Sequence, residues 1–131
     1  MGSDWRGFTT YLQSYKDFEV WKKAMDLAVE VYRLVKILPK SETYALSDQM
    51  RRAVISIPSN IAEGQGRNTT REFINFLGFA RGSQKELETQ LQLCVKVGYM
   101  TDEEIFVAMN LCEEVGKMLN TLIKKLKSTL T

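Results

Sequence analysis

The chain has 131 residues and contains no histidine, only two cysteines and only two prolines. Without histidine it lacks the commonest general base and the commonest metal ligand. Zinc would have to be held by Cys94, Cys112 and carboxylates, although the two cysteines are far apart in the sequence. We therefore expect that the protein is not an enzyme and that it has no cofactor and no metal site.

Long apolar runs are also missing. No run approaches the roughly 18 residues that a membrane-spanning helix needs, and no charged and then apolar leader marks secretion. We expect a cytoplasmic protein that does not contact the membrane. Cys94 and Cys112 fall on inward-facing helical positions, at heights about 10 Å apart. That separation excludes a disulfide, so we expect two buried free thiols.

Apolar residues repeat at intervals of three and four along four segments of the chain, which predicts amphipathic helices. We expect a flexible N-terminal extension at residues 1–14, a helical bundle at 15–127 and a short C-terminal tail at 128–131. No strand pattern competes with the helices. Because the connections between the later helices are short, the simplest closed arrangement is an up-down-up-down antiparallel four-helix bundle.

Particular residues set the expected ends of these helices. The second helix is predicted from about Thr43 to Ala62, with Gly64 as its C-terminal cap. Pro58 removes one hydrogen bond inside that helix, so the fold we predict is an all-α bundle with a proline-bent second helix. The third and fourth helices each open on a Thr-x-x-Glu capping box, at 69–72 and 101–104.

The net charge of the chain is only +2, but its arginines are unevenly distributed. Five of the seven arginines lie between Arg51 and Arg81, where Glu63 and Glu72 are the only acidic residues. Counting from the turn near Gly66 places Arg52 and Arg81 at the same height. Candidate phosphate contacts are Arg51, Arg52, Arg67, Arg71, Arg81 and Lys85. The alternative is that these cations form an ion-pair lattice with Asp48, Glu63, Glu72 and Glu88.

The apolar surface is broader than a monomeric bundle needs. The first helix carries two apolar lines, and the fourth adds Phe106, Met109, Leu111, Met118 and Ile123 outside its main seam. Surplus apolar surface commonly becomes a subunit interface. We therefore predict that the protein forms a homo-oligomer.

Several of these segments together resemble a known bacterial family. The string Ser-Ile-Pro-Ser-Asn-Ile-Ala-Glu-Gly at 56–64, Tyr-Lys-Asp-Phe-Glu-Val-Trp at 15–21 and Ala-Arg-Gly-Ser at 80–83 carry the resemblance. They are similar to the four-helix-bundle proteins encoded in intervening sequences of 23S ribosomal RNA genes. The resemblance implies a ring-like homopentamer, and kinship with the accessory variability proteins of diversity-generating retroelements, which bind a reverse transcriptase and nucleic acid through a basic surface.

Two hypotheses about function follow. The leading one is a non-enzymatic oligomeric bundle that binds RNA or a ribonucleoprotein partner through its arginine-rich surface. The second is a protein–protein interaction scaffold, in which the arginines pair with carboxylates and nucleic acid is not bound. The salt dependence of RNA binding separates the two, because phosphate contacts release counterions.

Overall fold

The computed structural model of the protein describes residues 15–130. Over this range the chain forms four α-helices and two short 3-10 helices, and no strand. The expected extension at residues 1–14 lies outside the described residues, as does the last residue of the expected tail. The prediction of an all-α chain with four helices is confirmed for the part described.

The first helix, α1 (Glu19–Val35), follows the 3-10 helix η2 (Tyr15–Asp17). One of the two predicted apolar lines, which includes Leu27 and Leu34, is fully buried. Trp21 and Ala28 of the other line are only half-buried and lie along the edge that faces the second helix. The apolar surface of α1 is therefore divided between the core and a surface groove.

The second helix, α2 (Leu46–Gln65), begins and ends later than the sequence predicted. The 3-10 helix η3 (Lys40–Glu42) and a turn occupy the residues before it. Gly64 is not the C-terminal cap but lies buried inside the helix, where a β-carbon would come within 2.7 Å of the Phe76 β-carbon. Gly66 caps the helix, and its N–H donates to the carbonyl of Ala62 at 3.2 Å. Gly64 thus allows α2 to approach the next helix closely.

The third and fourth helices are α3 (Thr70–Lys96) and α4 (Asp102–Ser128). At α4 the predicted capping box is complete, since Thr101 and Glu104 each accept a hydrogen bond from the other's backbone N–H. At α3 only half of the motif forms: the Thr69 hydroxyl accepts from the Glu72 N–H, but the Glu72 carboxylate accepts from the Thr69 hydroxyl.

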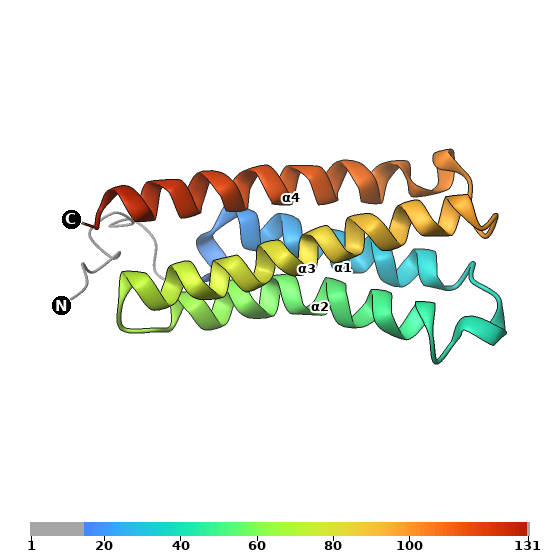
Figure 1. Ribbon diagram of the computed structural model, residues 1–131, viewed down its shortest axis with the longest axis horizontal. Helices are drawn as coiled ribbons and strands as arrows, with labels where there is room; N and C mark the ends of the chain where they lie inside the picture. Colours follow the sequence, from blue (N-terminus) through green and yellow to red (C-terminus); the bar gives the residue numbers. More distant parts are fainter. Residues whose placement is uncertain (1–14, 131) are drawn as a thin grey trace.

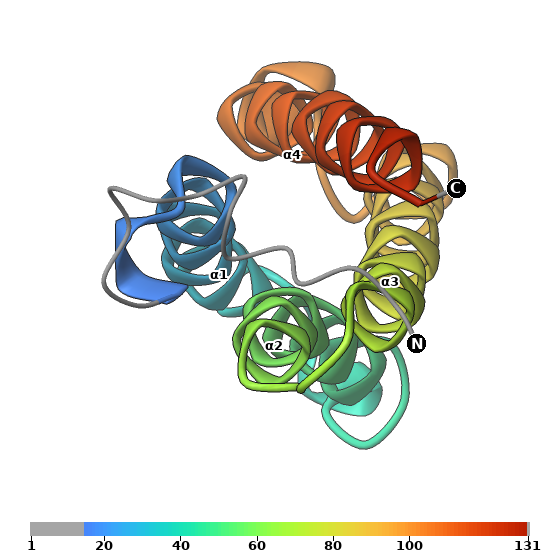
Figure 2. The ribbon, with the colours of Figure 1, turned by 90° about the vertical axis from the view of Figure 1, so that its left-hand side faces the viewer.

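Seen end-on, the four helices surround a common centre in chain order (Figure 2). α2 packs against α1 and α3, while α4 packs against α3 and returns to contact α1. The α1–α2 and α3–α4 connections lie at one end of the molecule and the α2–α3 connection at the other (Figure 1). These contacts fit a four-helix bundle.

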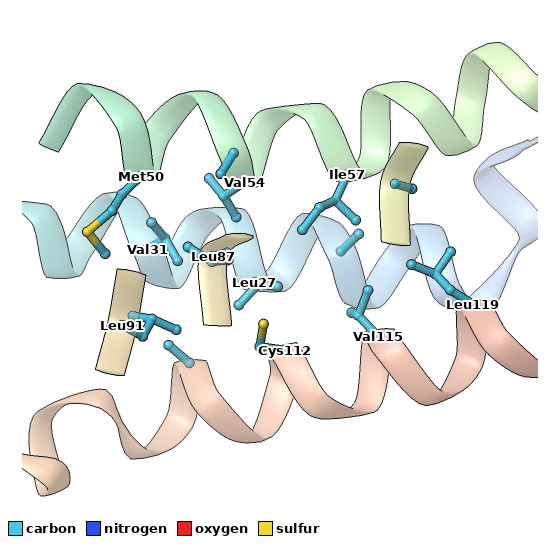
Figure 3. Close-up of a cluster of buried hydrophobic side chains, with 14 of the residues drawn as sticks. Leu27, Val31, Met50, Val54, Ile57, Leu87, Leu91, Cys112, Val115 and Leu119 are labelled. Carbon is cyan, nitrogen blue, oxygen red and sulfur yellow. The ribbon is translucent and has the colours of Figure 1, made fainter. Parts of the chain in front are cut away.

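Every helix contributes to one hydrophobic core. Leu27 of α1, Ile57 of α2, Leu91 of α3 and Leu119 of α4 are fully buried and point into the centre (Figure 3). Burying a side chain of this size stabilises the fold by roughly 1.5–3 kcal/mol. The core thus fixes the helices relative to one another and decides which residues remain on their outer surfaces.

Candidate nucleic-acid interface

A line of cations follows the outer edge of α3 on its α4 side. Residues 71, 74, 78, 81 and 85 are spaced by three and four, so they share one side of the helix. Arg71, Arg81 and Lys85 on this line are exposed. Between them, the glycine at position 78 leaves open space where a side chain would stand. A ligand could therefore approach the helix closely at the middle of the line.

A second line of cations runs along α4 beside the first. Asn120, Lys124 and Lys127 are spaced by four and three, and both lysines are exposed. Arg81 Nη1 donates to Asn120 Oδ1 at 3.2 Å, which ties the two lines together at this height. We call Arg71, Arg81, Lys85, Lys124 and Lys127 the basic face.

The charges of the basic face are poorly compensated. Of the five cations of the basic face, only Arg81 has a side-chain partner among the described residues, and this partner is the neutral amide of Asn120. Neither line contains a carboxylate between its first and last cation. Acidic residues enter at one end, where Glu88 accepts a hydrogen bond from Gln84 at 3.2 Å and Glu113 is exposed on α4. The face is therefore most basic between Arg71 and Arg81.

The other predicted contacts, Arg51, Arg52 and Arg67, do not lie on this face. Arg52 Nε is 3.0 Å from Asp48 Oδ2, and Arg67 Nη2 is 2.8 Å from Glu63 Oε1, so both form the ion pairs of the alternative interpretation. Arg51 is half-buried near the start of α2.

The sequence predicted that Arg52 and Arg81 lie at the same height along the bundle. In the structure they lie at different heights. Ser56 donates a hydrogen bond to Ser83, which aligns Arg52 with residues near Leu87. The prediction was wrong because α2 runs on to Gln65, which moves the centre of the α2–α3 hairpin toward its C-terminal side. The six predicted contacts therefore divide into three on the basic face and three elsewhere.

Sequence analysis missed Lys124 and Lys127 as surface cations next to α3. The spacing of residues 120, 124 and 127 was a usable signal, since it repeats the three-and-four spacing of the α3 line. What the sequence lacked was the register between α3 and α4, which is visible only from contacts such as that between Arg81 and Asn120.

The α3–α4 seam also holds a buried polar contact. Gln84 Nε2 donates to the carbonyl of Cys112 at 2.9 Å, while no described atom donates to Gln84 Oε1. Burial raises the pKa of the Cys112 thiol to about 12. A thiol with so high a pKa stays protonated at neutral pH and is a weak nucleophile.

An apolar groove lies between α1 and α2, away from the basic face. Its volume is about 630 Å³. Apolar side chains on its rim are unusually exposed to solvent: Val29 is 70% exposed and Ile55 is 45% exposed. The residues that line it are Tyr15, Trp21, Met25, Ala28, Val29, Tyr32, Ile55, Pro58, Ser59 and Ala62. A groove of this size and character is typical of a docking surface.

Neither a metal-binding cluster nor a membrane-spanning helix is found in the described part of the chain. No cluster of three or more cysteine, aspartate or glutamate side chains in residues 15–130 is arranged to hold a metal ion. None of the helices in the same range is long and apolar enough to span a membrane.

The fold and the basic face define a class: a small helical-bundle protein with a cationic surface over one helix pair. The chain belongs to the 23S rRNA-intervening sequence protein family, whose sequence pattern matches residues 16–121. This confirms the resemblance seen in the sequence.

A solved structure supports the assignment. It is that of a protein of unknown function from the S23 ribosomal protein family of Bacteroides thetaiotaomicron VPI-5482, which is similar to this chain with a TM-score of 0.75 and 31% sequence identity. The similarity covers 80% of this chain and 98% of that one. No protein with a curated function matches the chain.

Proposed function

We propose that this protein is a non-enzymatic, homo-oligomeric helical bundle that binds RNA, free or in a ribonucleoprotein, through the basic face. The observation that supports the proposal is the pairing of two lines of exposed cations on α3 and α4 with no carboxylate between their ends. The family name, 23S rRNA-intervening sequence protein, agrees with an RNA partner but specifies no activity.

The chemistry of the face suits a phosphate backbone. Arg71 and Lys85 are fourteen residues apart, which corresponds to about 21 Å along a helix. Arginine can hold a phosphate with two parallel hydrogen bonds, and the lysines add point charges beside it. Of the residues predicted from sequence, Arg71, Arg81 and Lys85 are the phosphate contacts in this proposal, and Lys124 and Lys127 join them.

The test compares two arginines that are alike except in position. Arg81→Glu, alone and with Lys124→Glu, reverses charge on the basic face, whereas Arg52→Glu makes the same change at an arginine already paired with Asp48. We expect the double variant to bind a fluorescent structured RNA at least tenfold more weakly, with Arg52→Glu close to wild type. Equal losses in all variants, or none, would refute the assignment; circular dichroism checks helicity.

The proposal includes details of the fold and assembly. The helices alternate in direction, up-down-up-down, which the positions of the connections support (Figure 1). Pro58 lies inside α2 and bends it, since it cannot donate to the carbonyl of Val54. The family resemblance makes a pentamer the preferred homo-oligomer. Two free buried cysteines are compatible with the reducing cytoplasm.

A specific observation also favours a second candidate, the protein–protein scaffold. The α1–α2 groove exposes apolar side chains that the bundle itself leaves uncovered. In that case Arg52 and Arg67 are structural ion pairs and the groove holds a protein partner. Binding that persists at high salt would favour this candidate, because apolar contacts release no counterions.

A further inference from the structure

Two exposed stripes, one on α1 and one on α3, have the same spacing of apolar and charged residues but carry opposite charges. On α1 and its C-terminal cap residue, Lys22, Val29 and Lys36 are spaced by seven residues, which is two helical turns or about 10 Å. On α3, Glu72 and Glu86 lie seven residues before and after Phe79. Each stripe thus has an apolar residue at its centre and a charge on either side. All six side chains are exposed, Val29 to 70% and Phe79 to 59%.

The surroundings of the two central residues are complementary in shape. Val29 lies on the rim of the α1–α2 groove, which has a volume of about 630 Å³. Phe79 stands beside Phe76, with ring centroids 5.7 Å apart and an interplanar angle of 88°. The Arg67 guanidinium covers the Phe76 ring at 4.7 Å. Phe79 at the centre of the α3 stripe therefore projects from the surface with Phe76 packed against it, whereas Val29 at the centre of the α1 stripe borders a groove.

Charges near each stripe leave most of this complementarity in place, although the exposed Asp26 lies beside Lys22 and Val29 on α1. Among the described residues, Lys36 and Glu86 have no side-chain partner. Lys22 has only a 3.4 Å contact with Glu19, in which both side chains are more than half exposed, and such pairs contribute little. Around Phe79, the positions that share its side of α3 between the two glutamates are uncharged.

The two stripes cannot meet within one molecule. α1 and α3 lie across the bundle from each other, with α2 and α4 between them (Figure 2). The complementary surface for each stripe is therefore on another copy of the chain. Because the two surfaces differ, the contact is heterologous and repeats from copy to copy, which generates a ring when the rotation closes.

We propose that the protein assembles by inserting Phe79 of one copy into the α1–α2 groove of the next, with Glu72 and Glu86 facing Lys22 and Lys36. This inference rests on the self-association in the proposed function and adds the two surfaces that form the contact. The occupant of the groove is then a second copy, and the basic face on α3 and α4 stays open beside the contact.

The experiment uses charge reversal and mixing, with molar mass measured by light scattering. Lys22→Glu with Lys36→Glu gives one variant, and Glu72→Lys with Glu86→Lys gives the other. Each variant alone juxtaposes like charges, so we expect its dissociation constant to rise at least tenfold. Mixed in equal amounts, the two variants have complementary stripes at every contact between unlike variants and should assemble again, although a ring of five keeps one contact between like variants. Lys124→Glu, a reversal on the basic face, should leave the molar mass unchanged.

The outcomes separate this inference from the proposed function. A wild-type chain that is monomeric at high concentration would overturn both. A wild-type oligomer with variants that assemble equally well, or with a mixture that stays dissociated, would overturn only the Phe79 contact. Glu72 also accepts a hydrogen bond from Thr69 at the start of α3. The single variant Glu86→Lys, mixed with Lys22→Glu or with Lys36→Glu, therefore repeats the test with that cap intact.

Discussion

At the scale of single residues, Gly64 is a point of close contact between α2 and α3. A β-carbon there would lie 2.7 Å from the Phe76 β-carbon and 3.0 Å from Phe73 Cδ1. The first of these atoms is fixed near the α3 backbone and cannot move aside easily. Gly64 therefore sets the distance between the two helices at the end of the bundle that carries the α2–α3 connection.

We predict that Gly64→Ala destabilises the protein by about 1–3 kcal/mol, the usual range for overpacking a tight contact. The measurement is urea unfolding followed by circular dichroism. Gly82→Ala is the matched control, because nothing lies within 4 Å of a β-carbon at that exposed helical position. The control should gain about 0.5–1 kcal/mol from helix propensity. Similar stabilisation in both variants would show that the close approach at Gly64 is not important.

The roles of single residues could be predicted from the sequence where their partners lie within one helical turn, and not where their partners lie on another helix. Thr101 and Glu104 act within one turn, so the sequence alone located their capping box. Gly64 was taken for a cap because a glycine near a helix end usually is one. Its actual role depends on Phe73 and Phe76 of another helix, and no local pattern encodes that contact.

At the scale of helices, α3 carries two different surfaces. Arg71, Arg81 and Lys85 lie toward α4, while Glu72, Phe79 and Glu86 lie on another side. The sequence predicted the first of these lines from its spacing. It could not predict that Lys124 and Lys127 of α4 would run beside that line, because register is set by contacts such as the one between Gln84 and Cys112. Two of the five cations of the basic face therefore depended on the pairing of helices and could not be predicted.

If the α3 and α4 lines bind phosphate together, their cations should contribute to the salt dependence of RNA binding about equally. We predict that changing Arg71, Arg81 and Lys124 to Gln reduces the slope of log K against log salt by about two to three, at about 0.7–0.9 per lost contact. Binding of a fluorescent RNA at several salt concentrations measures the slope. An unchanged slope with weaker binding would mean that these side chains act on the fold and not on phosphate.

At the scale of the whole molecule, function depends on how the surfaces are distributed around the bundle. The net charge of +2 gives no strong general attraction to nucleic acid, so any binding must come from a local concentration of cations. The basic face is on α3 and α4, and the apolar groove is on α1 and α2. The sequence indicated that apolar surface was in excess, but the partition of α1 between core and groove needed the packing of all four helices.

If the protein assembles through that groove, folding is coupled to association, because association between folded chains alone stabilises the folded state by mass action. We predict that the wild-type melting temperature rises with protein concentration over about two orders of magnitude. Phe79→Glu should melt at a temperature independent of concentration, since a carboxylate cannot enter an apolar groove without losing its hydration. Phe106→Glu is the control, because Phe106 is 61% exposed on α4 and belongs to neither stripe. The melting temperature of Phe106→Glu should still rise with protein concentration. If neither variant showed this concentration dependence, the contact would not be specific to Phe79 and would lie elsewhere on the surface.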